Sequence, residues 1–346
     1  MNLGGTLMLT QKKKRIFGAL AIVGTLFAGT GQAAAQAKPL TPVRYEEVIR
    51  SIFYLPSYLA LTEGYFKQEG LDVSMKTSWG SDKGTAALLS GSADIALIGP
   101  ETSVYIKNGE SPEKVKIFAG LTASDGSMLI SRKKIENFDW KMLKGKTVIS
   151  WRVGSSPDLF LRRILKNEGI DPKEVNQVTT LAAPARRGAF VAGNGDFGTF
   201  FEPDVSEMEK AGQAFYVTSI GRAVGDIDYT VFVATDSFIK KNPAVVQAWT
   251  NAIYRAQKYA MTGDPKAIAK SVSTFFTGVE LDMLASSVVR YRELGMFKTD
   301  PLTRPEAIKG LQDLLIEGGL LKESERVKYE DVVETKFARE AMTTIK

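Results

Sequence analysis

The stretch ALLSGSAD at residues 87–94 recurs as AFVAGNGD at residues 189–196. Each copy follows a second repeated motif at a distance of about twenty residues: EGLD at 69–72 in the first half and EGID at 168–171 in the second. Each copy also leads into an apolar run that ends at a pair of one proline and one glutamate. Because the order and approximate spacing of these motifs match, the sequence predicts two similar α/β lobes.

The pattern between these motifs is that of an α/β fold, in which short apolar runs alternate with helical patterns. We expect strands at 43–49, 72–77, 94–98, 115–121, 147–150, 175–179, 197–201, 214–220 and 230–235. At 171–174 (DPKE) an N-cap, a proline and a capping-box glutamate indicate a helix start. Ser156-Pro157 and Asn242-Pro243 have the same order of cap and proline, and the pattern from Asn242 onward is almost entirely helical.

The first 37 residues have the pattern of a secretory signal peptide. Lys12–Arg15 is a basic segment, and Ile16–Ala28 is an apolar run of 13 residues. Small residues follow, so cleavage is expected after Ala35 or Ala37. The apolar run is too short to cross about 30 Å of hydrocarbon. We therefore expect a soluble, exported protein that is located in a periplasm.

The composition of the 346-residue chain excludes several kinds of site. The chain has no cysteine and no histidine, so it lacks thiolate ligands, the commonest general base and the commonest metal ligand. We expect no catalytic residue, no metal and no cofactor. The net charge is +6, but the predicted signal peptide carries four of the positive charges, which leaves +2 for the rest. A nearly neutral protein gives no electrostatic argument for nucleic-acid binding.

Two motifs that match catalytic patterns fail in their context. GNGDFG at 193–198 has the letters of a dinucleotide fingerprint, but it precedes a predicted strand instead of linking a strand to a helix. Ser131–Lys134 has a serine–lysine spacing without the companion motifs of penicillin-binding enzymes.

The candidate binding site is expected where loops follow the carboxyl ends of the strands, because ligands of open α/β sheets bind there. Such loops are predicted at 51–57, 99–102, 151–156 and 202–204, and they line a shared cleft if the two lobes face each other. The candidate ligand-binding residues are Phe53, Tyr54, Trp79, Gly80, Ser81, Pro100, Glu101, Thr102, Trp151, Arg152, Gly154, Ser155, Ser156, Phe201 and Glu202.

The aromatic candidates have two interpretations. Tyr54 and Trp151 each follow a strand and precede a turn, where a flat ring can stack on a heterocycle or screen an ion from water. The alternative is that such rings belong to the core.

The turns at 80–82 and 154–156 offer hydroxyls and backbone N–H groups at helix starts, which suit an oxyanion. The alternative for the second turn is that Ser156 caps its own helix.

The charge of the ligand stays open. Glu101 and Glu202 occupy matching places in the repeat, and either carboxylate would favour a ligand with N–H donors or positive charge. As residues of a first helical turn, they also complement the helix dipole. Arg152 and Arg222 would instead favour an anionic ligand such as a sulfonate or carboxylate. The alternative is that each is an ordinary surface arginine.

A family resemblance emerges from four motifs taken in order. PSYLA at 56–60 with GYFKQEGLDV at 64–73 resembles the opening of the nitrate/sulfonate/taurine and thiamine-precursor binding proteins (the SsuA/ThiY/NMT1-like family). LLSGSADI at 88–95 resembles the next signature of that family, and GSS at 154–156 resembles its second-lobe ligand loop. Residues 232–245 resemble the segment by which the chain of that family returns into its first lobe. The likeness extends from about residue 42 to about residue 320.

The resemblance implies a two-lobed periplasmic binding protein fold (type II), in which two similar α/β domains are joined by a two-segment hinge. Its crossovers are expected near 121–127 and 225–229. Lobe 1 then comprises 38–123 and the mainly helical return 229–346, and lobe 2 comprises 124–228.

The resemblance also implies a function. A monomeric protein would capture a sulfonate, taurine, nitrate or aminopyrimidine thiamine precursor by clamp closure and deliver it to the membrane permease of an ABC importer. One alternative is an enzyme on the same scaffold. A related pyrimidine synthase uses iron and consumes one of its own histidines, which this chain lacks. Another alternative is a ligand-sensing partner of a membrane receptor.

Overall fold

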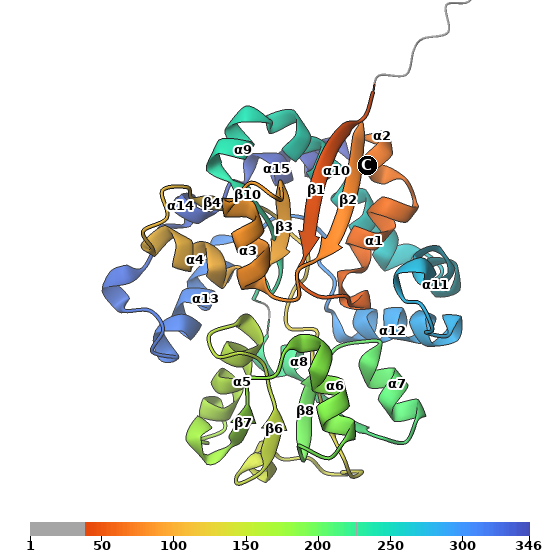
Figure 1. The fold of residues 1–346 in the computed structure, drawn as a ribbon, viewed down its shortest axis with the longest axis vertical. Helices are drawn as coiled ribbons and strands as arrows, with labels where there is room; N and C mark the ends of the chain where they lie inside the picture. The colour runs from red at the N-terminus through yellow and green to blue at the C-terminus, as the bar shows by residue number, and fades with distance from the viewer. Residues whose placement is uncertain (1–38, 226) are drawn as a thin grey trace, which may run out of the picture. The chain divides into compact units, whose positions relative to one another are not determined.

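Two five-stranded sheets organise the chain in the computed structural model, which describes residues 39–225 and 227–346 (Figure 1). The first sheet has the order β2 (Leu71–Thr77), β1 (Thr41–Glu47), β3 (Ile95–Ile98), β10 (Val231–Thr235) and β4 (Val115–Gly120). The second has the order β7 (Asn176–Val178), β6 (Thr147–Ile149), β8 (Phe197–Phe200), β5 (Met128–Ser131) and β9 (Phe215–Ser219). The predicted signal peptide lies outside the described residues.

The two sheets repeat one topology. In each, the first three strands are parallel, and the fourth runs antiparallel to both of its neighbours. The central strands β3 and β8 are buried along their whole length, as strands covered on both faces are. The prediction of two similar α/β domains is therefore confirmed. We call the part built on the first sheet lobe 1 and the part built on the second sheet lobe 2.

Helices follow most strands and cover the sheets. Before the last crossover they are α1 (Leu55–Thr62), α2 (Tyr65–Gln68), α3 (Ser81–Leu89), α4 (Glu101–Asn108), α5 (Ser156–Asn167), α6 (Ala183–Val191), α7 (Asp204–Lys210) and α8 (Ile220–Val224). After it come α9 (Asp236–Lys241), α10 (Pro243–Thr262), α11 (Pro265–Val272), α12 (Leu281–Leu294), α13 (Pro305–Glu317), α14 (Tyr329–Val332) and α15 (Lys336–Thr344). Short 3-10 turns lie at Ile52–Tyr54 (η1), Trp140–Leu143 (η2), Pro172–Glu174 (η3), Ser273–Phe275 (η4) and Glu323–Glu325 (η5).

The chain passes between the sheets twice, once between β4 and β5 and once between α8 and β10. The two crossing segments are hydrogen-bonded to each other: the Leu121 N–H donates to the Thr230 carbonyl at 3.0 Å, and the Thr122 and Thr230 hydroxyls lie 2.7 Å apart. The two crossover segments thus lie side by side and connect the lobes together.

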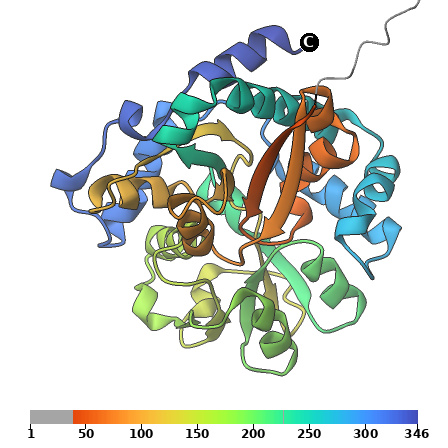
Figure 2. The same ribbon diagram turned by 45° about the horizontal axis from the view of Figure 1, so that its top comes forward.

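The C-terminal helices contact both lobes. Helix α10 packs on α1, α2 and α15 in lobe 1 (Figure 2), while α12 contacts α7 and α13 contacts α5 in lobe 2. Two ion pairs support these contacts, Arg290–Glu202 at 2.7 Å and Arg163–Glu317 at 2.5 Å. The C-terminal segment is thus a further link between the lobes.

Nine strands were predicted within about two residues of their observed bounds, and the predicted helical C-terminal segment is also confirmed. Strand β5 was missed, because its four residues directly follow the segment 121–127 that was predicted as a crossover and have no helical segment before them. The expected capping box at Asp171 is present, but it begins a turn of only three residues. The prediction that Ser156 caps α5 is wrong, since Ser155 is the N-cap and Ser156 is the first helical residue.

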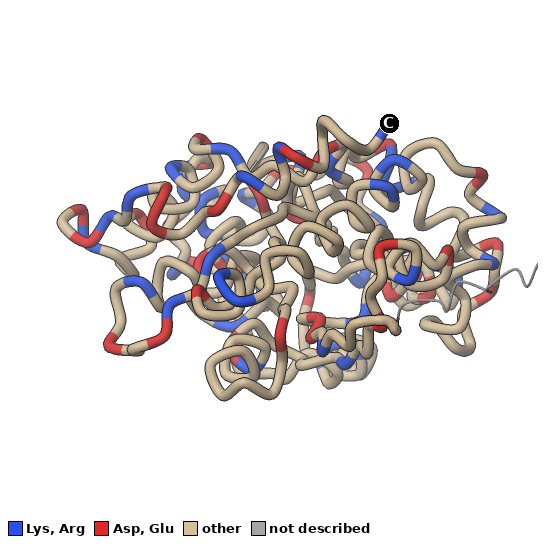
Figure 3. Tube along the Cα trace, turned by 90° about the horizontal axis from the view of Figure 1, so that it is seen from above, with Lys and Arg blue, Asp and Glu red and all other residues tan. Residues whose placement is uncertain are grey.

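Charges of both signs are interspersed over the described part of the chain (Figure 3). Within that part, no helix combines the length and the apolar character that crossing a membrane requires.

Candidate functional site

A cavity of about 570 Å³ lies where the strand ends of both lobes meet. Its wall consists mainly of residues that follow the carboxyl ends of β1, β2 and β3 in lobe 1 and of β6, β7 and β8 in lobe 2. The lining residues are Val48, Ile49, Tyr54, Trp79–Lys83, Gly99, Glu101, Trp151–Val153, Ser155–Pro157, Thr179–Ala183, Phe201, Tyr229 and Thr230. This is the edge at which open α/β sheets bind ligands.

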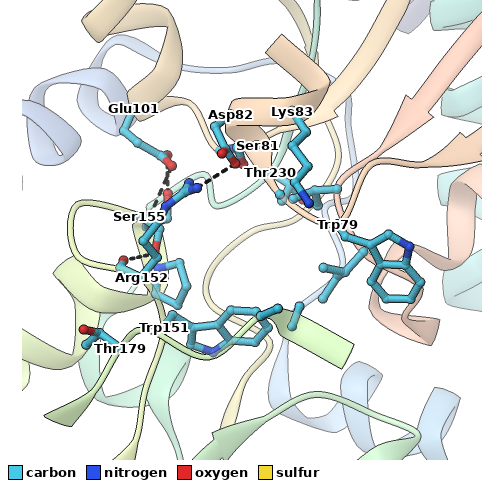
Figure 4. A pocket seen from close by; sticks show the side chains of 18 of the residues that line it. Trp79, Ser81, Asp82, Lys83, Glu101, Trp151, Arg152, Ser155, Thr179 and Thr230 are labelled. Atoms are coloured by element: carbon cyan, nitrogen blue, oxygen red, sulfur yellow. Dashed lines mark hydrogen bonds and ion pairs between the residues drawn. The ribbon is translucent and has the colours of Figure 1, made fainter. Parts of the chain in front are cut away.

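Two tryptophans form part of the wall on the side away from Glu101 (Figure 4). Trp79 follows β2, is 43% exposed and has a φ of 60°. A left-handed conformation is unfavourable for a bulky residue, and such conformations cluster at functional sites. Trp151 follows β6 and packs on Phe201, with ring centroids 5.4 Å apart. The two indoles offer flat apolar surfaces from opposite lobes.

Trp151 is held in place by a buried arginine. The Arg186 guanidinium lies 3.5 Å from the centre of the indole, which is a close cation–π contact. The guanidinium also donates to the backbone carbonyls of Thr199 at 2.8 Å and Ser150 at 3.2 Å. Burial lowers the pKa of Arg186 to about 9. The buried cation thus braces Trp151 from behind the cavity wall.

Two phenols supply unpaired polar atoms to the wall. Tyr54 and Tyr229 are almost fully buried, and neither hydroxyl has a hydrogen-bond partner within residues 39–225 and 227–346. Burial raises the pKa of each phenol well above its usual value. Both are therefore neutral groups that can donate or accept a hydrogen bond from a ligand.

Glu101 is a buried residue of lobe 1 whose carboxylate contacts lobe 2. It is the first residue of α4, and it accepts a hydrogen bond from the Ser156 N–H of lobe 2 at 3.3 Å and a second from the Ser156 hydroxyl. Burial raises the pKa of Glu101, and the hydrogen bonds from Ser156 counteract part of that effect.

A second contact between the lobes joins Asp82 of α3 to Arg152, with 2.6 Å between carboxylate and guanidinium. Burial raises the pKa of Asp82, but the hydrogen bond and charge of Arg152 outweigh it, so the pKa is lowered. The neighbouring Lys83 has no ion pair within the described residues, and Figure 4 shows its ammonium directed toward the cavity. Lys83 is thus an uncompensated positive charge on the wall.

Ten of the fifteen predicted residues line this cavity, namely Tyr54, Trp79, Gly80, Ser81, Glu101, Trp151, Arg152, Ser155, Ser156 and Phe201. The other five, Phe53, Pro100, Thr102, Gly154 and Glu202, do not. Ligand contact by any of them stays a prediction.

The five residues outside the wall have other surroundings. Phe53 is fully buried and stacks on Phe201 at 5.6 Å. Glu202 faces Arg290. The Gly154 N–H, which was expected to face an oxyanion, donates to Asp158 at 2.9 Å.

Pro100 is the N-cap of α4, and the Thr102 hydroxyl donates to the Gly99 carbonyl at 2.7 Å. Arg222, the other arginine considered as a counter-ion, donates to the Glu293 carbonyl and does not line the cavity. All three are thus engaged outside the wall.

Sequence reasoning missed part of the wall. The segment Thr179–Ala183 follows β7 in the same way that Trp79 follows β2. Extending the comparison of the two repeats to the loop after β7 would therefore have identified this part of the wall. Tyr229 and Thr230 belong to the second crossover, and no local motif indicates that a crossover residue faces the cavity.

Comparison with known proteins agrees with this arrangement. The family model described as "NMT1/THI5 like" matches residues 53–268, which is more than half of the chain. The chain belongs to the NMT1/THI5-like family. YtlA of Bacillus subtilis (strain 168), described as a proposed binding protein, is 36% identical over 320 residues, covering 92% of this chain and 95% of YtlA. The 4-amino-5-hydroxymethyl-2-methylpyrimidine phosphate synthase THI13 of Saccharomyces cerevisiae is 25% identical over 243 residues, covering 62% of this chain and 65% of the synthase.

Solved structures show the same fold. The alkanesulfonate-binding protein SsuA from Xanthomonas axonopodis pv. citri, bound to MOPS, superposes with a TM-score of 0.71 at 17% identity, covering 86% of this chain and 100% of SsuA. The periplasmic nitrate-binding protein NrtA from Synechocystis PCC 6803 gives a TM-score of 0.73 at 16% identity, covering 89% of each chain. The chain therefore has the two-lobed fold of the periplasmic binding proteins of ABC import systems, as the sequence predicted.

Proposed function

We propose that this protein is a solute-binding protein that captures a small organic molecule between its lobes and delivers it to the permease of an ABC importer. The observation that carries the proposal is the 570 Å³ cavity, whose wall combines strand-end loops of both lobes. A ligand that contacts both lobes binds the closed form more tightly than the open form, and that difference drives closure.

The size of the cavity argues for an organic ligand over nitrate. Ligand pockets for organic molecules occupy roughly 300–1,000 Å³, and this cavity is within that range. Nitrate is of the order of one or two water molecules in size, each of which takes up about 30 Å³. It would therefore fill only a small part of the space.

The lining supports a ligand with a flat, mainly apolar body. Trp79 and Trp151 can contact such a body from opposite lobes, and the free hydroxyls of Tyr54 and Tyr229 can bind its polar edge. An aminopyrimidine of the thiamine-precursor class has this form, and we propose it as the first class to test. Organosulfonates are the second class, because the ammonium of Lys83 would attract a negative charge.

We propose further that the protein is not an enzyme. The synthase of this family is expected to consume a histidine, and the chain has none. Relatives that match over nearly the whole chain or share its fold, YtlA, SsuA and NrtA, are described as binding proteins. Export to a periplasm, a monomeric state and lobe bounds of 38–123 with 229–346 and of 124–228 belong to the same proposal.

A thermal-shift screen of the purified protein tests the proposal. The panel contains aminopyrimidines, aliphatic sulfonates with taurine, and nitrate. A ligand at one hundred times its Kd stabilises the folded protein by about 2.7 kcal/mol, so the Tm should rise clearly for one organic class. A rise with nitrate alone would contradict the ligand class, and no rise with any solute of the panel would contradict the function.

A further inference from the structure

The N-terminus of α5 carries a carboxylate from the other lobe. This helix of 12 residues starts at the cavity wall, where backbone N–H groups and the helix dipole favour an anion. The Ser156 N–H donates to one Glu101 oxygen at 3.3 Å, and the Ser156 hydroxyl donates to the other. Glu101 is only 2% exposed. The most attractive position for a ligand's oxyanion is thus already filled by the protein.

The neighbouring donors are also engaged. The Gly154 N–H donates to the Asp158 carboxylate at 2.9 Å, and the Ser155 N–H donates to the Arg152 carbonyl at 3.1 Å. The Arg152 guanidinium is paired with Asp82 at 2.6 Å. The backbone N–H groups of residues 154–156 are thus all engaged, so an anionic ligand group at the α5 N-terminus would have to displace a partner that the protein already supplies. It would also approach the two oxygens of the Glu101 carboxylate, which act as acceptors and offer an oxyanion no hydrogen bond.

We propose that Glu101 is a specificity-determining residue of this site, which excludes oxyanions by occupying the N-terminus of α5. The inference rests on the proposed function and deepens it: of the two organic classes proposed there, the cavity selects neutral solutes or solutes with N–H donors, and Glu101 opposes the attraction of Lys83 for sulfonates and sulfate. The Glu101 carboxylate keeps lone pairs beyond the two that Ser156 engages, so an N–H donor of the ligand is accepted where an oxyanion is rejected.

The repeat provides a matched control in Glu202. This carboxylate is also buried and also accepts from a serine N–H and hydroxyl, those of Ser206, at 3.0 and 2.9 Å. It differs in pairing with Arg290 and in lying outside the cavity wall. Removing either carboxylate changes the net charge of the protein equally, but only removal of Glu101 frees the α5 terminus toward the cavity.

Isothermal titration with methanesulfonate and with sulfate tests the inference on the full-length protein and two variants, Glu101→Ala and Glu202→Ala. We expect Glu101→Ala to bind methanesulfonate about tenfold to a hundredfold more tightly than the unsubstituted protein, the range for hydrogen bonds to a charged group. Glu202→Ala should show no gain. Adding Ser156→Ala to Glu101→Ala should remove most of the gain, because the freed hydroxyl is lost.

An affinity of Glu101→Ala within about threefold of the unsubstituted protein would overturn the inference, as would an equal gain in Glu202→Ala. Circular dichroism checks that each variant is folded. If alanine unfolds the protein, Glu101→Gln replaces it, and a gain is still expected because the charge is gone.

Titration of the organic solute found in the thermal screen separates the two proposals. If that solute binds but Glu101→Ala gains no oxyanion affinity, only the specificity role fails, whereas no binding by any variant overturns the function as well.

Discussion

The two sides of the lobe junction are built differently. On the cavity side, the lobes meet through polar groups such as the Asp82–Arg152 pair, in which both side chains are 53% exposed. On the crossover side, they meet through the fully buried ring of Phe53, which stacks on Phe201 at 5.6 Å and contacts Tyr291 at 5.2 Å. Polar contacts can be exchanged for contacts to a ligand, whereas a close-packed ring cluster cannot. The polar contacts thus belong to the side that binds and the Phe53 ring to the side that holds the lobes together, and Phe201 lies at the boundary because it also lines the cavity.

Glycine allows the close packing on the crossover side. A Cβ on Gly126, in the first crossover, would lie 2.5 Å from the Phe53 ring. The crossover backbone therefore rests directly on the aromatic cluster. Stability should therefore depend on this side of the junction, and ligand affinity should depend on the other.

The largest expected effect is that of Phe53→Ala. Replacing a fully buried phenylalanine by alanine costs about 3–5 kcal/mol, and Phe53 contacts aromatic rings of both lobes. Urea denaturation followed by circular dichroism measures the change. A loss below about 1 kcal/mol would mean that the cluster does not hold the lobes together.

The second effect concerns Asp125, a fully buried carboxylate in the first crossover whose pKa is raised to about 7 by burial. Since the folded pKa exceeds the unfolded one, this group stabilises the fold below about pH 4, and the contribution is lost as pH rises through 7. Asp125→Asn should therefore be more stable than the unsubstituted protein at pH 8, by up to about 4 kcal/mol. The two proteins should be similar at pH 4.

Denaturation curves of both proteins across this pH range give the difference directly. Asparagine keeps an oxygen that can accept from the Ser127 N–H, as Asp125 does at 2.7 Å. A difference that does not change with pH would contradict the assignment to Asp125.

The smallest effect is expected on the cavity side. Arg152→Ala removes a half-exposed ion pair, and such pairs contribute about 0–1 kcal/mol. The free energy of unfolding should therefore fall by no more than that. A loss above about 2 kcal/mol would place a structural role on the side that we assign to binding.

The sequence predicted the fold well because the repeated motifs and apolar runs are local patterns that the two sheets preserve. It also predicted the strand-end turns that carry Trp79, Glu101 and Trp151 to the wall, because the carboxyl ends of parallel strands share one edge. It could not predict that Glu101 would contact Ser156, since that contact depends on how one lobe faces the other.

The roles of Arg186 and Asp125 could not be predicted either. Nothing in the sequence indicates that an arginine of α6 would be buried behind Trp151 or that a crossover aspartate would lack exposure to water. Both are consequences of packing between elements that are distant along the chain.

The central claim is that affinity arises from the cavity between the lobes. Its most direct test is isothermal titration of the organic solute found in the screen into Trp151→Ala, with Trp140→Ala as the control, since Trp140 lies on η2 and does not line the cavity. The account predicts at least about a tenfold loss of affinity for Trp151→Ala, consistent with a lost aromatic contact and its buried area, and no loss for Trp140→Ala. Unchanged affinity in a folded Trp151→Ala would contradict it.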